Sequence, residues 1–247
     1  KIARRNLSVV GEYQIEVETN IPRQVGLAGS SAIETAFLRA ILEAEGIDVP
    51  EPRQLAELIL KVETEELGMV AGLQDRLPQA FEEPLHMDFA EELMTSRGYG
   101  AYVTVEASEF PPLWVAHALS GKDSGETHSD LAKRWEENDS SMTEVIAHLA
   151  DGANQGRVAL ENSNYSELTA LIDTNFDLRQ VLFGNEALGD TLQAVKLARN
   201  LGSCAKQTGS GGAIFGIIPH SEFTTIAAPA FAEMGWTFHS EIQVVRE

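Results

Sequence analysis

Cysteine is almost absent from this sequence, whose 247 residues contain a single thiol, Cys204. One cysteine cannot form an internal disulfide, and its surroundings, GSCAKQTG, offer no second thiol for a paired-cysteine metal or redox site. Disulfide-stabilised secreted domains and two-thiol redox proteins are therefore excluded. We expect a protein of a reducing compartment, the cytoplasm.

Basic residues are also scarce, because 18 lysines and arginines stand against 38 acidic residues and give a formal net charge of −20. So acidic a surface disfavours nucleic acids and anionic lipids as broad binding partners. No apolar run reaches the length of a membrane span. We expect a small-molecule ligand and neither a nucleic acid nor a membrane partner, and the oligomeric state stays open. An anionic ligand would need a local positive site.

The sequence does contain the patterning of a folded α+β protein, with 43% apolar residues. Alternation predicts a strand over Tyr13–Thr19, and spacings of three and four residues predict a helix from Ser30 to about Gly46 that buries Ile33, Phe37 and Ile41. A polar loop after residue 119 predicts two domains, 1–119 and 120–247. Further helices are expected over about 51–67, 142–160, 168–182, 188–201 and 221–235, and further strands over 84–89, 101–107, 113–119, 213–218 and 236–245.

A run of small residues, GLAGSSA, opens the first of these helices and has two interpretations. Ser31 and Glu34 match a capping box, in which the two side chains satisfy backbone N–H groups and no ligand is needed. Alternatively, a glycine loop at the positive end of a helix binds a phosphate, with Ser30 and Ser31 as extra donors or as Mg²⁺ ligands. No lysine precedes the serines, so the run is not a P-loop.

Two carboxylates and a second glycine turn add to this signal. Glu63 could hold Mg²⁺ or be a solvated surface residue, and Asp75 could act as a base or cap the short helix that follows it. The turn KQTGSGGA, from Lys206 to Ala213, brings three glycines and two hydroxyls before a buried strand. Such a turn either approaches a ligand closely or only joins a helix to a strand.

These motifs resemble those of the GHMP kinases, the superfamily of galactokinase, homoserine kinase and mevalonate kinase. PRQVGLAGSSA, from Pro22 to Ala32, is similar to its phosphate-binding motif, and Lys206 to Ala213 to its third motif. The resemblance implies a two-domain α+β fold. Its N-terminal domain would resemble domain 2 of ribosomal protein S5, and its C-terminal domain would be ferredoxin-like.

The same resemblance implies a kinase that uses ATP and Mg²⁺, and it assigns a role to each matching residue. Asp75 would be the catalytic base, Glu63 and Ser31 would be the metal ligands, and Arg76 and Thr208 would contact the substrate. The residues expected to bind the nucleotide phosphates are Gly26, Leu27, Ala28, Gly29, Ser30 and Ser31, closed over by Gly209, Ser210 and Gly211.

Within the superfamily, the segments GLQDR, HMDF and SGKDSGETHS are most similar to the glucuronokinase branch. This similarity implies phosphorylation of D-glucuronate to D-glucuronate 1-phosphate. Kinases of galactose, fucose or heptose stay open as alternatives, as does a non-catalytic binder of nucleotide or sugar. The first motif of the superfamily is not found in this chain, and the chain does not begin with methionine. We expect it to be truncated at its N-terminus.

Overall fold

The computed structural model describes residues 7–119, 139–209, 211–242 and 244 of the chain. The described residues divide into two compact units. Residues 7–21 and 28–104 belong to the first unit, and residues 22–27 and those from 105 onward belong to the second. The phosphate-binding motif is therefore divided between the units. Gly26 and Leu27 belong to the second unit, and Ala28 to Ser31 belong to the first.

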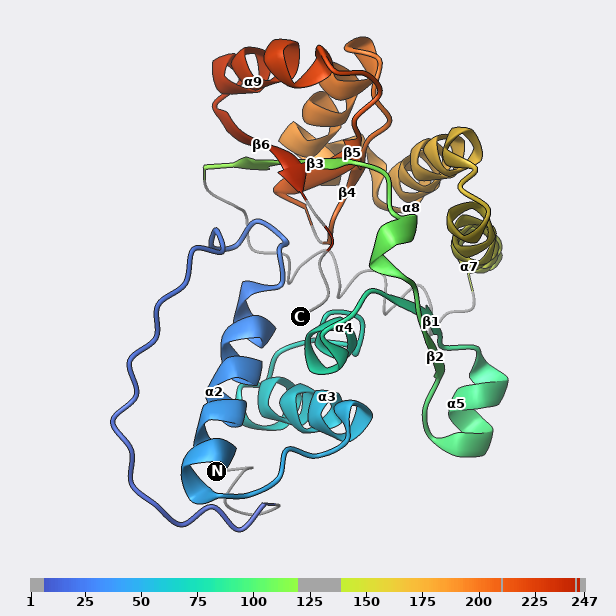
Figure 1. Ribbon diagram of the computed structural model, residues 1–247. Coiled ribbons are helices and arrows are strands. Elements are labelled where there is room, and N and C mark those ends of the chain that lie inside the picture. The colour runs from blue at the N-terminus through green and yellow to red at the C-terminus, as the bar shows by residue number, and fades with distance from the viewer. Residues whose placement is uncertain (1–6, 120–138, 210, 243, 245–247) are drawn as a thin grey trace. The chain divides into compact units, whose positions relative to one another are not determined.

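The first unit combines helices with a two-stranded sheet, and its α-helices and strands are labelled in Figure 1. Its elements are α2 (Gly29–Glu45), α3 (Pro52–Lys61), the π-helical turn η1 (Val62–Glu66), α4 (Arg76–Phe81), β1 (Leu85–Asp88), α5 (Glu91–Arg97) and β2 (Ala101–Thr104). Strands β1 and β2 pair in antiparallel fashion. Gly46 ends α2 in the left-handed conformation, with φ 66°, which glycine adopts without strain.

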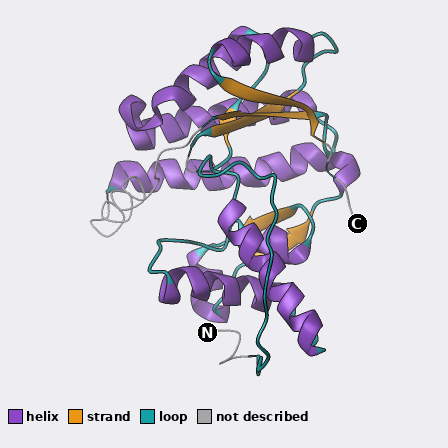
Figure 2. Cartoon of the chain, turned by 90° about the vertical axis from the view of Figure 1, so that its left-hand side faces the viewer, coloured by secondary structure: helices purple, strands orange, loops and turns teal. Residues whose placement is uncertain are grey.

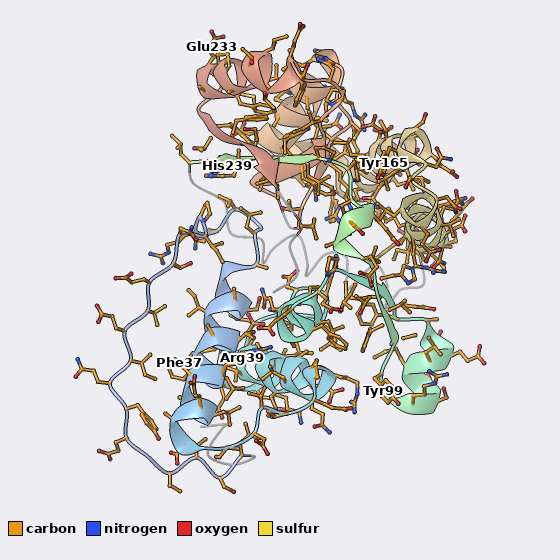
Figure 3. All side chains as sticks on the ribbon, viewed as in Figure 1. Phe37, Arg39, Tyr99, Tyr165, Glu233 and His239 are labelled. Atoms are coloured by element: carbon orange, nitrogen blue, oxygen red, sulfur yellow. The ribbon has the colours of Figure 1, made fainter. Side chains whose placement is uncertain are left out.

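Helix α2 was predicted correctly, and Ile41 is buried as expected, but the rest of its buried face differs from the prediction. Its buried apolar residues are Leu38, Ile41 and Leu42, which pack in a core with α3 and α4. Phe37 was expected in that core and is instead 41% exposed. Figure 3 labels Phe37 and Arg39 on this helix. Because adjacent stripes on α2 are both apolar, only the contact with α3 and α4 selects between them.

The strand predicted over Tyr13–Thr19 is wrong. These residues form no ladder with any described strand, and Tyr13, Ile15 and Val17 are 42%, 37% and 51% exposed. Alternation of apolar and polar residues describes the side chains of a half-buried strand. A strand also needs a neighbour for its backbone hydrogen bonds, and none of the described strands takes that position.

The second unit is built on the antiparallel sheet β4-β5-β3-β6, and Figure 2 shows helices on both sides of it. Trp114 of β3 is fully buried on one face, against Phe223 and Phe231 of α9. The elements are the 3₁₀ turn η2 (Ala107–Glu109), β3 (Leu113–Ala118), α7 (Ser140–Glu161), α8 (Tyr165–Asn200), β4 (Lys206–Gln207), β5 (Ala213–Ile217), α9 (Phe223–Glu233) and β6 (Trp236–Ile242).

The helices and strands expected after residue 100 are confirmed with small shifts at their ends. The two helices predicted over 168–182 and 188–201 are the halves of α8, which is interrupted by non-helical backbone at Gly184 and Gly189. Helix α9 continues through Pro229. None of the helices in the described ranges is both long and apolar enough to cross a membrane.

The second unit begins before the domain boundary predicted after residue 119. Strand β3, Leu113–Ala118, pairs with β5 on one side and β6 on the other, so it lies inside the sheet of the second unit. The composition changes only at the polar loop that follows this strand. Residues 120–138 of that loop, including His128, lie outside the described residues.

Candidate active site

Helix α2 begins at the centre of the small-residue run. Ala28 precedes its first residue in the left-handed conformation, with φ 53°, and no side chain in the described structure caps this end. The first turn also contains no acidic residue. The backbone N–H groups and the partial positive charge of this helix end are therefore available to an anion.

The role of Ser31 as a Mg²⁺ ligand stays a prediction, but its hydroxyl does not form the predicted capping box. It donates a hydrogen bond to the carbonyl oxygen of Ala28, over 3.2 Å, and the residue is 1% exposed. The capping box with Glu34 is wrong, because the helix already begins at Gly29 and Ser31 lies within its first turn. A hydroxyl in that position bonds back to the preceding turn.

Ser30 is the serine that reaches Glu63. Its hydroxyl donates to Glu63 Oε1 over 3.3 Å. Glu63 lies in η1, where a π-helical turn extends α3, and its side chain is fully buried. The solvated surface glutamate that the sequence allowed is thereby excluded. A π-helical turn is frequent at functional sites, where the extra residue changes the direction of the side chains.

Arg76, at the start of α4, is bound by acceptors of the first unit. Its guanidinium pairs with Glu63 Oε2 and donates to the carbonyl oxygen of Gly72 over 2.8 Å. Its side chain is only 9% exposed. Arg76 is thus held in an ion pair within the first unit. A role of Arg76 toward the substrate stays a prediction.

Asp75 immediately precedes α4 but makes no capping hydrogen bond with its side chain in the described structure. The purely structural role considered for it is therefore not found. Its Oδ2 lies 3.6 Å from Arg76 Nη1, and its side chain is 48% exposed. The carboxylate is thus held near a fixed cation and is open to a ligand.

Glu34 belongs to this cluster and was missed as a candidate site residue. Burial and the neighbouring charge of Glu63 raise its pKa from 4.5 to about 7, against the opposing influence of Arg76. Its Oε2 atom is buried without a hydrogen-bond partner among the described residues. The signal was present in the sequence, because Glu34 follows Ser30 by four residues and so shares its face of the helix.

We expect Glu34→Gln to stabilise the protein above neutral pH. The raised pKa means that the folded state keeps a proton that the unfolded state loses as the pH rises above about 4.5, so the free energy of unfolding falls up to about pH 7. Glutamine removes this loss. Urea unfolding in Mg²⁺-free buffer should show a larger gain at pH 8 than at pH 5.5. Equal gains at both pH values, or the same gain in the exposed control Glu43→Gln, would contradict the assignment.

The second glycine turn, from Lys206 to Ala213, contacts the part of the phosphate-binding motif that belongs to the second unit, residues 22–27. Thr208 donates from its hydroxyl to the carbonyl oxygen of Gly26 over 2.8 Å. A Cβ at Gly212, where φ is 86°, would lie 2.9 Å from the Cα of Val25, so only glycine fits there. Gly209 and Gly211 belong to this turn, while Ser210 lies outside the described residues. The hydroxyl of Thr208 thus positions the loop.

The chemistry of the first-unit cluster fits Mg²⁺. Oxygen ligands are preferred by this ion, which keeps several waters and substrate phosphates in its coordination shell. Glu63 uses Oε2 for Arg76 and presents Oε1 to the hydroxyl of Ser30. No group of three or more metal-binding side chains occurs among the described residues.

Comparison with known proteins agrees with these motifs. Residues 1–83 match the family described as GHMP kinases N terminal domain. The chain is 42% identical over 210 residues to probable glucuronokinase 2 of Arabidopsis thaliana, covering 84% of this chain and 57% of that protein. Glucuronokinase 1 of the same plant is 39% identical over 208 residues, covering 84% and 58%. The chain thus spans less than two thirds of these relatives.

Solved structures share the fold. Lactococcus lactis galactokinase in complex with galactose superposes with a TM-score of 0.71 and 15% identity, over 98% of this chain and 73% of that one. The mevalonate kinase of Methanococcus jannaschii gives a TM-score of 0.65 and 19% identity, over 92% and 67%. By its matches in sequence and fold, the chain belongs to the GHMP kinase superfamily.

Proposed function

We propose that this chain carries the machinery of a sugar 1-kinase, which transfers the γ-phosphoryl group of ATP to the anomeric hydroxyl of D-glucuronate. The observation that carries the proposal is the identity of 42% and 39% to two glucuronokinases over 84% of the chain. The cluster of Ser30, Glu63, Asp75 and Arg76 within the first unit supports it, because these residue types serve phosphoryl transfer.

The start of α2 binds the phosphates of ATP in this proposal. Its first turn has backbone N–H groups without a capping side chain, and no acidic residue of that turn opposes an anion. The residues concerned are Gly26, Leu27, Ala28, Gly29, Ser30 and Ser31, with Gly209, Ser210 and Gly211 from the second turn. Their N–H groups stabilise negative charge that develops on the transferred group.

Mg²⁺ is the proposed metal, with Glu63 as its protein ligand. Its companion was expected to be Ser31, but the hydroxyl contact between Ser30 and Glu63 Oε1 favours Ser30. Ser31 is committed to the carbonyl oxygen of Ala28. The ion would shield the phosphate charges and orient the γ-phosphoryl group.

Asp75 accepts or orients the proton of the attacking hydroxyl in this proposal. Its carboxylate is 48% exposed, and its Oδ2 lies 3.6 Å from Nη1 of the Arg76 guanidinium. Arg76 then acts by positioning Asp75 and Glu63. Thr208 acts by holding the carbonyl group of Gly26.

A galactose kinase is the second candidate, supported by a galactokinase of Thermotoga petrophila that is 25% identical over 188 residues. The two sugars differ at C6, which is a carboxylate in glucuronate and a hydroxymethyl in galactose, and in the configuration at C4. The lower identity to galactokinase makes glucuronate the first choice. A non-catalytic homologue would bind ATP and transfer nothing.

Phosphorylation of a sugar panel tests the proposal. The protein is incubated with ATP, Mg²⁺ and either glucuronate, galacturonate, galactose, fucose or a heptose, and the release of ADP is followed together with the 1-phosphate by ³¹P NMR. We expect turnover with D-glucuronate that stops with EDTA and returns with Mg²⁺. Turnover with galactose alone would select the second candidate, and ATP binding without turnover of any sugar would refute a kinase.

A further inference from the structure

Two cations of the second unit are set into the protein without an acidic partner among the described residues. Arg179 of α8 donates from Nη2 to the carbonyl oxygen of Gly209 over 2.8 Å, and its Nε is buried without a hydrogen-bond partner in the described structure. Lys206 of β4 lies with Nζ 5.7 Å from the centre of the Phe215 ring. Helix α8 packs directly against β4 and β5.

The acidic residues on the same part of α8 are already paired with another cation. Asp173 and Asp177 both accept from Arg199, over 2.9 Å and 2.8 Å. Asp173 also accepts from the backbone N–H of Ala205 over 3.1 Å. They are therefore not free to neutralise Arg179 and Lys206, although the chain carries 38 acidic residues in all.

Burial makes these two charges costly. It lowers the pKa of Lys206 to about 8, and the nearby charge of Arg179 contributes to the decrease. Burial also lowers the pKa of Arg179. A desolvated cation is retained at such a cost where an anion binds to it. In a protein with a net charge of −20, a cation pair of this kind marks a place for an anionic ligand.

We propose that Arg179 and Lys206 bind the carboxylate of a uronic acid substrate. The proposal rests on the proposed sugar kinase function and names the contact that separates a uronic acid from a neutral sugar. Arg76, which the family resemblance expects to contact the substrate, is paired with Glu63. Arg179 is bonded to Gly209, which places its guanidinium beside the turn of the third motif.

The chemistry of the two side chains suits a carboxylate. A guanidinium binds carboxylate oxygens through its planar set of N–H donors, and Nε of Arg179 is a donor without a partner. The ammonium of Lys206 adds a compact charge. An oxyanion of the nucleotide has the same chemistry, but the backbone N–H groups of the α2 start already serve the phosphates in the proposed function. The carboxylate is therefore the ligand to which we assign the pair.

Calorimetric binding to the 247-residue chain tests this assignment without requiring turnover. We expect Lys206→Met to weaken D-glucuronate binding by about 10- to 100-fold, the usual loss for a charge-assisted hydrogen bond. ADP binding should stay unchanged. The exposed Lys196 of α8 supplies the matched control Lys196→Met, which should bind glucuronate normally. Arg179→Lys, which keeps the charge and loses the planar donor set, should also weaken glucuronate binding, and it serves if Lys206→Met fails to fold.

Each outcome decides the assignment. Unchanged glucuronate affinity in both variants, or a wild type that binds glucuronate no better than D-glucose, would overturn it. Weaker ADP binding with intact glucuronate binding would reassign the pair to the nucleotide and overturn it too. The proposed kinase function is judged separately. If the protein phosphorylates a sugar but both variants bind glucuronate as tightly as the wild type, the kinase function stands and the carboxylate site does not. If glucuronate binding depends on Lys206 but no sugar is phosphorylated, the carboxylate site stands and the kinase function does not.

Discussion

Replacing Asp75 with asparagine should lower kcat for the sugar substrate by about 10²- to 10⁴-fold, the usual contribution of a positioned general base. Asparagine keeps the shape of the side chain but cannot accept the hydroxyl proton. The carboxylate is 48% exposed and makes no structural capping bond in the described chain, so the fold should tolerate the change. ATP affinity should change little, because the proposed phosphate contacts are at the start of α2.

Steady-state measurement of ADP release, with nucleotide affinity from calorimetry, separates the two quantities for Asp75→Asn. The matched control is Asp48→Asn, because Asp48 is an exposed aspartate of the same unit and lies outside the proposed site. It should retain normal kcat and normal ATP affinity. Near-normal turnover in Asp75→Asn would remove Asp75 as the base, and lost ATP binding would move it to the nucleotide site.

Arg76→Met should destabilise the protein by about 3–5 kcal/mol, the cost of leaving a buried charge without its partner. Glu63 is fully buried, and Glu34 beside it adds a second acidic group. With methionine at position 76, the Glu63 carboxylate would have to take up a proton or draw water into the core. Urea unfolding followed by circular dichroism measures the loss.

A second substitution distinguishes the ion pair from general damage to packing. In the double variant Arg76→Met with Glu63→Gln, no charge is left unpaired, so much of the lost stability should return. An exposed pair provides the control: Arg157→Met breaks an i,i+4 contact with Glu161 on α7 and should cost only about 0.3–0.5 kcal/mol. If Arg76→Met lost no more stability than this control, the pair of Arg76 and Glu63 would contribute little to stability.

Local patterns in the sequence were sufficient for most of the helices and strands and for the position of the motifs, although they missed α5. The short helix after Asp75 begins at Arg76 and ends at Phe81, as the pattern indicated. The two halves of α8 are separated at glycines, where the chain leaves helical geometry. These features depend on residues close in sequence, so propensity and spacing describe them well.

Contacts between distant residues could not be predicted in the same way. Glu63 and Arg76 are 13 positions apart, and Ser30 and Glu63 are 33 apart. Which serine meets Glu63 depends on the starting residue of α2 and on the π-helical turn that carries the glutamate. A change of one residue in either element turns the side chain by about 100° and replaces one serine with the other.

The sequence by itself determined the superfamily motifs, the acidic character and most of the helices and strands, because these are written in neighbouring residues. Only the tertiary structure decided the partners of the charged groups. It paired Arg76 with Glu63, left Arg179 and Lys206 without an acid among the described residues, and left the 13–19 segment without a neighbouring strand. The physical reason is that burial and charge pairing depend on how elements far apart in the chain pack together.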